Sequence, residues 1–533
     1  MAALSETQVV AILVGLVTIR VAWEFLFSPL RAFPGPVIAK FTDAWRAFLN
    51  SQWHSDRHVR EWHRRWGTAV RIGPNAISIS DPTMIKVIYT TRDSWAKSDM
   101  YAVNDVVFDG ERLANVFSLR DQAVHAQQAK PIRGLWALGK LLEMEACVDQ
   151  VIQMFVDKLG HDFADTEPGK RYCMMEDWLT YFAWDAAANV TFGHPLGFIQ
   201  QGRDVRRLIK ESRDTTTYFA VVSQIPWLDS WLGKNPIVPL GSRGILWSFS
   251  TAAELYAEYD SAASGNAKAG DDCHGNYFID KYHKLKDTHP DCVDDKQVMH
   301  YLVLNVAAGG DPVAGALRAI VYHLAKSSPA YRKLVAELDA AQFSLPAQWK
   351  DVSKLLYLDA VIYEAARMAP SIGSMLERIV PAKGLELPDG RYIPAGTKVG
   401  INPCVISRDT HVFGDDVDSF KPERWLQRPD EDDQQYAMRY QRMRETADFM
   451  FGTGSRVCMG KALAKMEMYK LTATLYRMFD ASVSNRHWIA INSATDSLWP
   501  KQIRLPDERH EWTYRNSWFM FHENIPMVIT RRT

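Results

Sequence analysis

Long runs of residues with apolar side chains at helical spacing constrain this chain more than any other feature. An α-helix brings positions i, i+3, i+4 and i+7 onto one face, so each run predicts a helix with one buried face. The chain shows no fixed-period repeat, which excludes solenoids and propellers. The fold class predicted is therefore mainly α. The runs cover residues 141–159, 178–190, 298–325, 331–338, 355–368 and 461–478.

Segments typical of β-strands are short and few. They lie at residues 69–79, 385–401 and 518–529, and the second contains the turn Pro388-Asp389-Gly390. The fold expected is α+β with small sheets beside a large helical body. Residues 261–297 are rich in Gly, Asp, Lys and His, and we expect a long surface connection between helices there.

The composition narrows the class of protein. Of 533 residues, 47% are hydrophobic and 23% are charged, which indicates a globular chain with a large core. The 62 Lys and Arg residues nearly balance the 63 Asp and Glu residues, so the chain has no long-range field to attract nucleic acid. Six scattered cysteines are too few for a disulfide framework and favour a reducing compartment.

The amino-terminal residues 9–27 are almost entirely apolar. A helix needs about 20 such residues to cross a bilayer, and this segment reaches that length if Arg20 and Glu24 lie at the interface. A cleaved signal peptide is the alternative, but no small-x-small cleavage site follows Ile19. The sequence therefore predicts a retained single-pass membrane anchor.

Positive charge follows this anchor, which predicts that the body of the chain faces the cytosol. A second apolar cluster, residues 225–240, contains prolines that prevent a regular helix; it either joins the core or dips into the membrane surface. The predicted organisation is a lumenal tip at 1–8, an anchor at 9–27, a proline-rich strap at 28–36 and one large domain at 37–533.

The most specific segment is the loop 451–460, Phe-Gly-Thr-Gly-Ser-Arg-Val-Cys-Met-Gly, which leads directly into a predicted helix. Cys458 lies at the amino end of that helix, where the helix dipole and free N–H groups are expected to lower the thiol pKa and favour metal binding. Arg456 places a cation where an anionic cofactor group could lie. A buried structural cysteine is the alternative interpretation.

The loop resembles the Phe-x-x-Gly-x-Arg-x-Cys-x-Gly haem-binding loop of the cytochrome P450 superfamily. Phe451, Gly454, Arg456, Cys458 and Gly460 match its five defining positions. The resemblance implies haem b as cofactor, with Cys458 as the axial thiolate ligand of the iron, Arg456 on a propionate and Phe451 beside the sulfur. A thiolate ligand pushes electron density toward O–O cleavage, which suits oxygen activation.

Further matches follow in the order of the family. Glu364-Ala365-Ala366-Arg367 resembles its Glu-x-x-Arg motif, and Arg424 resembles the third member of the buried ion network. By the same resemblance Arg378 contacts the second propionate. The role implied for the network is structural, because removing one partner of a buried ion pair is strongly destabilising.

An earlier helix carries a less complete match. The run His125-Ala126-Gln127-Gln128-Ala129-Lys130 resembles a pattern in which an arginine at the fifth position contacts haem, but Ala129 stands there. Either Lys130 or His125 replaces that arginine, or neither residue does.

The helix expected over 298–325 is interrupted by Ala308-Gly309-Gly310-Asp311-Pro312-Val313 and is expected to kink at Pro312. This run resembles the oxygen-binding segment of the family, Ala-Gly-x-Asp-Thr-Thr, except that Pro312 replaces the threonine whose hydroxyl helps to deliver protons. One hypothesis is that water on the Ala308 carbonyl, together with Asp311, replaces that hydroxyl. The alternative is chemistry that needs no such relay, such as peroxide-driven oxidation, rearrangement or ring expansion.

The resemblance is strongest to fungal microsomal members, which typically act in secondary metabolism. It implies a monooxygenase that hydroxylates or otherwise oxidises a hydrophobic small molecule, expected to be an intermediate of secondary metabolism. O2 is the co-substrate, NADPH supplies electrons through a membrane reductase, and cytochrome b5 is a further candidate donor. A monomer at the endoplasmic reticulum membrane is expected. A non-catalytic haem carrier is the alternative that needs no reductase.

Residues about 488–506 look like extra sequence before the final hairpin. By position along the chain, the resemblance also indicates a set of substrate contacts. They are Tyr101, Phe117, Val306, Ala307, Ile372, Leu376 and Phe521.

Overall fold

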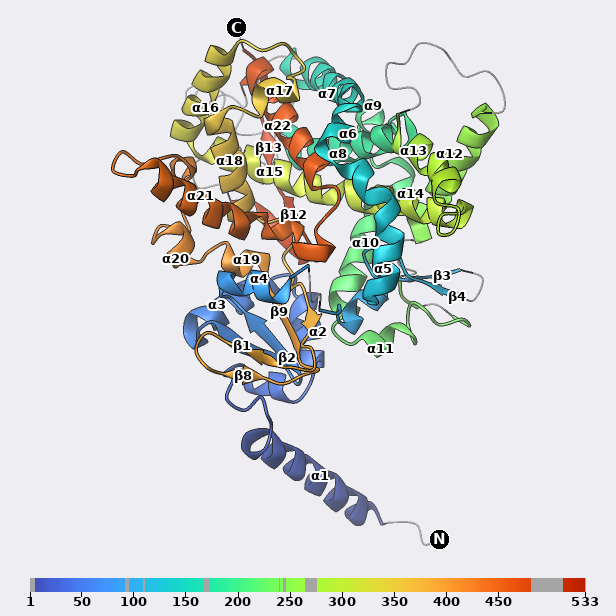
Figure 1. Cartoon of the computed structure of the whole chain (residues 1–533), viewed down its shortest axis with the longest axis vertical. Helices are drawn as coiled ribbons and strands as arrows, with labels where there is room; N and C mark the ends of the chain where they lie inside the picture. Colours follow the sequence, from blue (N-terminus) through green and yellow to red (C-terminus); the bar gives the residue numbers. More distant parts are fainter. Residues whose placement is uncertain are drawn as a thin grey trace, which may run out of the picture.

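The computed structural model describes residues 5–91, 95–108, 111–165, 172–238, 240–242, 246–263, 276–480 and 511–532 (Figure 1). Helices make up most of it, as the apolar periodicity predicts. The α-helices are α1 (Glu6–Leu26), α2 (Ala44–Ser51), α3 (Ser55–Trp66), α4 (Ile85–Ile88), α5 (Gln122–Arg133), α6 (Leu138–Leu142), α7 (Glu145–Leu159), α8 (Met175–Phe192), α9 (Phe198–Gln201), α10 (Leu208–Val222), α11 (Pro226–Asp229), α12 (Leu246–Ala263), α13 (Phe278–Thr288), α14 (Asp295–Gly309), α15 (Asp311–Lys326), α16 (Ser328–Ala341), α17 (Trp349–Val352), α18 (Leu356–Met368), α19 (Pro403–Ile406), α20 (Thr410–Phe413), α21 (Asp433–Ala447) and α22 (Lys461–Met478).

The strands form small sheets at the edge of the helical body. The largest sheet has the order β1-β2-β9-β6, in which β2 and β9 are parallel and the other pairs are antiparallel. The strands are β1 (Ala69–Gly73), β2 (Ala76–Ile79), β3 (Val106–Phe108), β4 (Glu111–Leu113), β5 (Cys173–Met174), β6 (Arg378–Ile379), β7 (Leu385–Glu386), β8 (Tyr392–Ile393), β9 (Lys398–Ile401), β10 (Phe479–Asp480), β11 (Thr513–Ser517), β12 (Phe519–Glu523), β13 (Pro526–Met527) and β14 (Thr530–Arg531).

Two helices at the centre of the body, α8 and α15, are buried around most of their circumference. Such helices need apolar or small residues on every side, and both sequences supply them. α15 packs against α8, α18 and α22, and α22 begins and ends at the residues predicted. These helices hold the structure together and carry the segments that form the site.

The surface connection predicted over residues 261–297 is wrong in part. α13 lies within it and buries Phe278, Ile279, Tyr282 and Leu285 against the core. These four residues have helical spacing, but the charged residues among them obscure the apolar pattern in the sequence.

The predicted anchor, residues 9–27, lies in α1 except for its last residue, Phe27. Within the described part of the chain, no helix has the length and hydropathy that a membrane span needs. The last turn of α1 contacts the body, because the buried Glu24 accepts a hydrogen bond from Nη2 of Arg71 at 2.8 Å and is also paired with Arg20. Burying these charges requires such pairing.

The proline-rich strap lies directly on the sheet. The Arg71 N–H donates to the Pro34 carbonyl at 2.7 Å, and a Cβ on Gly35 would come within 2.1 Å of the Arg71 carbonyl oxygen. Only glycine allows this close approach of two backbones. The strap is therefore fixed to β1 by a backbone contact that the sequence did not predict. The extra segment near 488–506 lies outside the described residues.

The Glu-x-x-Arg motif on α18, Glu364 to Arg367, forms a buried network of hydrogen bonds and ion pairs beside the central helices. The Glu364 carboxylate accepts five hydrogen bonds of 2.8–3.0 Å, two from Arg367 and one each from Arg424, the Lys421 N–H and the Trp425 indole. Burial alone would raise the pKa of Glu364, but its hydrogen bonds and the charges of the two arginines hold it below its ordinary value. The network thus ties α18 to the segment before α21.

Candidate active site

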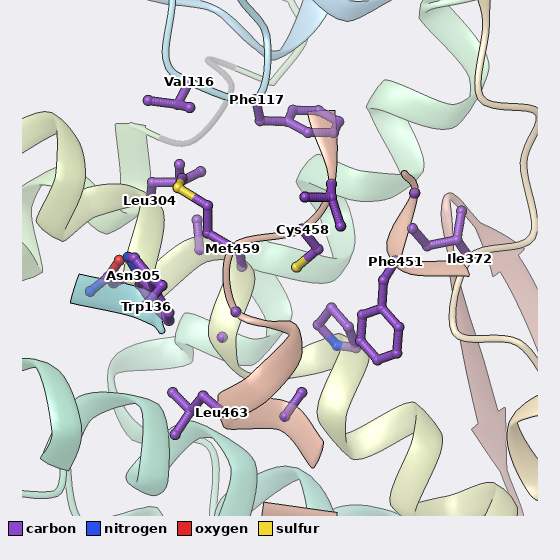
Figure 2. A pocket seen from close by; sticks show the side chains of 18 of the residues that line it. Val116, Phe117, Trp136, Leu304, Asn305, Ile372, Phe451, Cys458, Met459 and Leu463 are labelled. Atoms are coloured by element: carbon purple, nitrogen blue, oxygen red, sulfur yellow. The ribbon is translucent and has the colours of Figure 1, made fainter. Parts of the chain in front are cut away.

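The loop 451–460 is a tight turn that presents Cys458 to an internal cavity (Figure 2). The Cys458 N–H donates to the Phe451 carbonyl at 2.7 Å, which closes the loop on itself. Gly454 adopts φ +68°, and a Cβ there would lie 2.1 Å from the Tyr89 carbonyl oxygen. The glycine therefore permits both the turn and the contact with the segment after α4.

The thiol of Cys458 differs from the sequence prediction in one respect. The residue is open to the cavity. Its enclosure deep in the protein nevertheless raises the pKa of the thiol above the ordinary value, whereas hydrogen bonds from the Gly460 and Lys461 backbone and the Lys461 charge act in the opposite direction. The predicted lowering by the helix terminus is outweighed by the loss of water. A metal ion on the sulfur would replace the proton, because a coordinated thiol is deprotonated.

The cavity that Cys458 faces has a volume of about 540 Å³ and is mostly apolar. Its roof is an aromatic cluster with edge-to-face contacts, in which the ring centroids of Phe219 and Trp518 are 5.0 Å apart and those of Tyr101 and Phe117 are 5.4 Å apart. An aromatic wall of this kind can bury a hydrophobic ligand of moderate size, and its ring-to-ring contacts keep the cavity in one shape.

Basic side chains gather around one part of the cavity wall. Arg456 is held by Gln122 Oε1 at 3.2 Å, but its Nη1 is buried and without a partner. Arg378 donates to its neighbouring Glu377 carbonyl and lies over the Tyr89 ring. Among the described residues no carboxylate forms an ion pair with either arginine. Burial and the charge of Arg378 lower the pKa of Arg456 to about 10.

Lys97 joins this group, and sequence analysis missed it. The backbone of Lys97 forms an isolated antiparallel β-bridge with that of Arg378. Its ammonium group donates to the Phe117 carbonyl and lies 4.3 Å from the centroid of the Tyr101 ring. Burial and the charges of Arg378 and Arg456 hold the pKa of Lys97 well below its ordinary value. A lone lysine far from any motif gives no signal of this role in the sequence.

On α5 the structure distinguishes His125 from Lys130, the two residues that could replace the haem-contacting arginine. His125 is buried and lines the cavity, whereas Lys130 is exposed and does not line it. Arg133, which sequence analysis missed, also lines the cavity. The spacing 125, 129, 133 follows one helical face, and this is the signal that could have identified Arg133 and excluded Lys130. Burial and the neighbouring cations, Arg456 first, lower the pKa of His125 to about 3.

Across the cavity, the predicted kinked helix consists of α14 and α15, which meet at Gly310. A Cβ on Gly309 would lie 2.6 Å from that of Ala187, and one on Gly310 would lie 2.5 Å from the Trp184 ring. The break therefore packs tightly on α8. Because Pro312 has no N–H, the Ala308 carbonyl lacks its usual donor, and both residues line the cavity.

Asp311 lies behind the cavity wall at the helix break. Its carboxylate is buried and accepts hydrogen bonds from Trp184 Nε1 at 3.1 Å and from Ser212 Oγ at 2.7 Å. Asp311 does not line the cavity itself, but Ser212, whose hydroxyl donates to it, does. The relay of water and Asp311 stays a prediction. Asp311 also fastens the helix break to α8 and α10.

The predicted substrate contacts divide into two groups. Val306 lies on the core face of α14, and Phe521 lies behind the hairpin turn, since the chain reverses at Trp518 with φ +74°. Trp518 and Phe519 reach the cavity in place of Phe521. The five that line the cavity are Tyr101, Phe117, Ala307, Ile372 and Leu376.

Comparison with known proteins supports a common origin over most of the chain. Residues 48–502 match the family model described as Cytochrome P450. The chain is 31% identical to Cytochrome P450 monooxygenase cfoH of Aspergillus candidus, covering 95% of this chain and 89% of that protein. It is 34% identical to Cytochrome P450 monooxygenase AFLA_114810 of Aspergillus flavus, covering 88% and 90%.

Two glycines of the loop 451–460, Gly454 and Gly460, allow a test of the turn that presents Cys458. We expect Gly454→Ala to destabilise the protein, because a non-glycine residue at positive φ costs about 1–3 kcal/mol before the clash with the Tyr89 carbonyl is counted. Gly460→Ala is the control, since its Cβ would make only ordinary contacts of 3.6–3.9 Å. Thermal unfolding of the purified variants measures both, and equal melting temperatures would contradict the assigned turn.

Proposed function

Because this chain belongs to the cytochrome P450 family of oxidoreductases, we propose that it is a monooxygenase that hydroxylates or similarly oxidises a hydrophobic small molecule. One observation carries the proposal: the Cys458 sulfur faces an apolar cavity whose wall holds basic side chains without carboxylate partners. The substrate class proposed is an intermediate of fungal secondary metabolism, in keeping with the organisms of the similar proteins.

The residues around the cavity fit haem b. Cys458 would ligate the iron, and Arg456, Arg378, Lys97 and His125 would hold the two propionates; the unpartnered Nη1 of Arg456 is the donor that most needs such an anion. Bound haem supplies the activation of O2. The chain's own part is to exclude water with its aromatic roof and to orient the substrate against Ala307, Ile372 and Leu376.

Electrons are proposed to come from NADPH through a separate membrane reductase, with cytochrome b5 as a further donor. The near-neutral net charge agrees with partners chosen by local surfaces and not by a long-range field. We propose that the protein acts as a monomer.

The sulfur can be tested directly. We expect Cys458→Ser to remove the red-shifted band of the reduced carbon monoxide complex and to reduce NADPH-dependent turnover to background, because oxygen replaces the thiolate ligand. Cys292→Ser is the matched control, since that thiol is half-buried outside this cavity. Retention of the band by Cys458→Ser would contradict the assignment.

A second candidate function follows from Pro312, which brings no hydroxyl to the cavity. An enzyme that takes oxygen from peroxide, or that rearranges or expands a ring of its substrate, needs no such donor. We expect turnover with NADPH and reductase to exceed turnover with hydrogen peroxide alone. Product formed only with peroxide would favour the second candidate, and mass analysis for added oxygen would separate oxidation from rearrangement.

We also propose attachment to the cytosolic face of the endoplasmic reticulum membrane. α1 and α11 lie toward the same end of the long axis (Figure 1). α1 exposes many apolar side chains. The segment after α11 exposes Trp231, Ile237 and Leu240. The buried Asp229, just before this segment, fixes its start by accepting hydrogen bonds from Tyr218 and Arg112. Exposed aromatic and aliphatic side chains of this kind suit the lipid interface.

Vesicle binding measures this surface. We expect the purified protein to float with phosphatidylcholine vesicles and the double variant Trp231→Ser, Ile237→Ser to float less, because each loses buried apolar area. Leu356→Ser is the control, since Leu356 is comparably exposed on α18 and lies outside the proposed membrane surface. Equal flotation of all three proteins would contradict the proposed surface.

A further inference from the structure

Ser212 on α10 carries a buried hydroxyl that connects the cavity to a carboxylate behind the cavity wall. The residue lines the cavity and is 2% exposed. Its Oγ donates to Oδ2 of Asp311 at 2.7 Å. Asp311 is the first residue of α15, and Pro312, which follows it, also lines the cavity. The Ser212 hydroxyl therefore lies at the break between α14 and α15.

Other hydroxyls of the same wall are bonded differently. Thr216, one helical turn further along α10, donates to the Ser212 and Arg213 carbonyls. Ser371 donates to the Pro312 carbonyl at 2.9 Å. A backbone carbonyl cannot take up or release a proton near neutral pH, whereas a carboxyl group can do both. The partner of Ser212 therefore allows a task that the partners of Thr216 and Ser371 do not.

The Asp311 carboxylate is fixed from two sides. The Trp184 indole of α8 donates to its Oδ1 at 3.1 Å, while Ser212 donates to its Oδ2. The aspartate is 3% exposed. An indole N–H only donates, so it cannot accept a proton from the carboxyl group. The oxygen that can exchange a proton with a neighbour is therefore Oδ2, which faces the hydroxyl on the cavity side.

Two arginines outside the cavity wall share the surroundings of Asp311. The charges of Arg213 and Asp311 both act on the pKa of Arg318, and Arg213 follows Ser212 directly on α10. Nε of Arg213 and Nη1 of Arg318 are buried and have no hydrogen-bond partner among the described residues. Buried donors of this kind are satisfied by water. Such water would link Asp311 to the half-buried Arg213, and so to the solvent.

The proposed reaction consumes protons inside the cavity. Transfer of one oxygen atom from O2 to a substrate takes up two electrons and two protons, and the other oxygen atom leaves as water. The cavity is mostly apolar, and Pro312 brings no hydroxyl to it. The protons therefore need a polar group of the wall through which to enter.

We propose that Ser212 passes protons from Asp311 to water in the cavity. A proton that reaches Asp311 reverses the hydrogen bond, so that the carboxyl group donates to Ser212 Oγ. As this proton moves to the hydroxyl, the original O–H bond of Ser212 breaks and its proton passes to the cavity water. Asp311 is then a carboxylate again, and the hydroxyl turns back to it. The inference rests on the proposed monooxygenase function, and it takes from α10 the hydroxyl that Pro312 cannot supply.

The test compares wild type with Ser212→Ala and Ser212→Thr, each as the full-length protein loaded with haem. Alanine removes the hydroxyl, whereas threonine keeps it and adds a methyl group at a buried site. A role in packing alone would tolerate alanine better than threonine, and a role in proton transfer requires the opposite order. Thr217→Val is the matched control, because it removes a hydroxyl of α10 that donates to Ser517 and does not line the cavity.

The first readout needs no activity. Loss of a hydrogen-bond donor changes the electron distribution of a carboxylate, so we expect Ser212→Ala to shift an infrared carboxylate band relative to wild type. The same substitution in an Asp311→Asn background should leave the carboxylate region unchanged, because the responding group is gone. Identical carboxylate bands in wild type and Ser212→Ala would overturn the inference.

The second readout is the product of O2 reduction by NADPH and the reductase without added substrate. Each O2 reduced to hydrogen peroxide takes up two electrons and two protons, and each O2 reduced to water takes up four of each. A slower proton supply therefore favours hydrogen peroxide. We expect Ser212→Ala to lower the ratio of water to hydrogen peroxide roughly tenfold, less than the full 10²–10⁴ of a positioned acid because other water still delivers some protons. Thr217→Val should keep the wild-type ratio, and Ser212→Thr should restore most of it.

The outcomes separate this inference from the proposed function. Ser212→Ala with the wild-type ratio and a normal reduced carbon monoxide spectrum would overturn the inference and leave the function intact. A ratio lower in Ser212→Thr than in Ser212→Ala would also overturn it, in favour of packing. Wild type without that spectrum would overturn the function, and the inference with it. If Ser212→Ala does not fold, Ser212→Cys decides, because a thiol fills a similar space but donates weakly: the wild-type ratio in that variant overturns the inference.

Discussion

Repulsion among buried cations is the constraint on which the site depends. Lys97, Arg378 and Arg456 come from three distant parts of the chain. Burial and the charges of the two arginines lower the pKa of Lys97, burial and the charge of Arg378 lower that of Arg456, and the described residues offer no carboxylate to pair with them. Burying like charges is unfavourable unless an anion joins them. The carboxylates of a haem would provide it, so that one binding event would stabilise the segment before β3, the strand β6 and the Cys458 loop together.

The opposite wall is governed by packing. Gly309 and Gly310 allow α14 and α15 to approach α8 to a distance that no side chain would permit, and Asp311 fastens the break through Trp184. In this protein the acid of the oxygen-binding motif therefore serves the contact between helices. The break has the glycines that close packing on α8 requires, while Pro312 brings no hydroxyl. The two properties can separate because backbone shape depends on glycine and proton transfer depends on hydroxyl and carboxyl groups.

Much of this arrangement could be predicted from the sequence where a local pattern fixes it. The apolar periodicity of α22 gives its bounds, and the loop 451–460 identifies Cys458 and Arg456. Prediction failed where the cause lies in tertiary structure. Lys97 carries no local signal, and the core face of Val306 depends on how α14 rotates against its neighbours. The raised pKa of Cys458 follows from its enclosure in the folded protein, which no motif encodes.

Two buried glutamates on neighbouring helices show how the environment sets the charge of a carboxyl group. Glu364 accepts five hydrogen bonds, and its arginine partners hold its pKa below the ordinary value although burial opposes them; such a carboxylate has no proton to give. Glu467 has no such partners, so burial alone raises its pKa and retains the proton. The same side chain is thus a fixed negative charge in one place and a neutral acid in the other. The difference arises from the donors around each carboxyl group and not from its depth in the core.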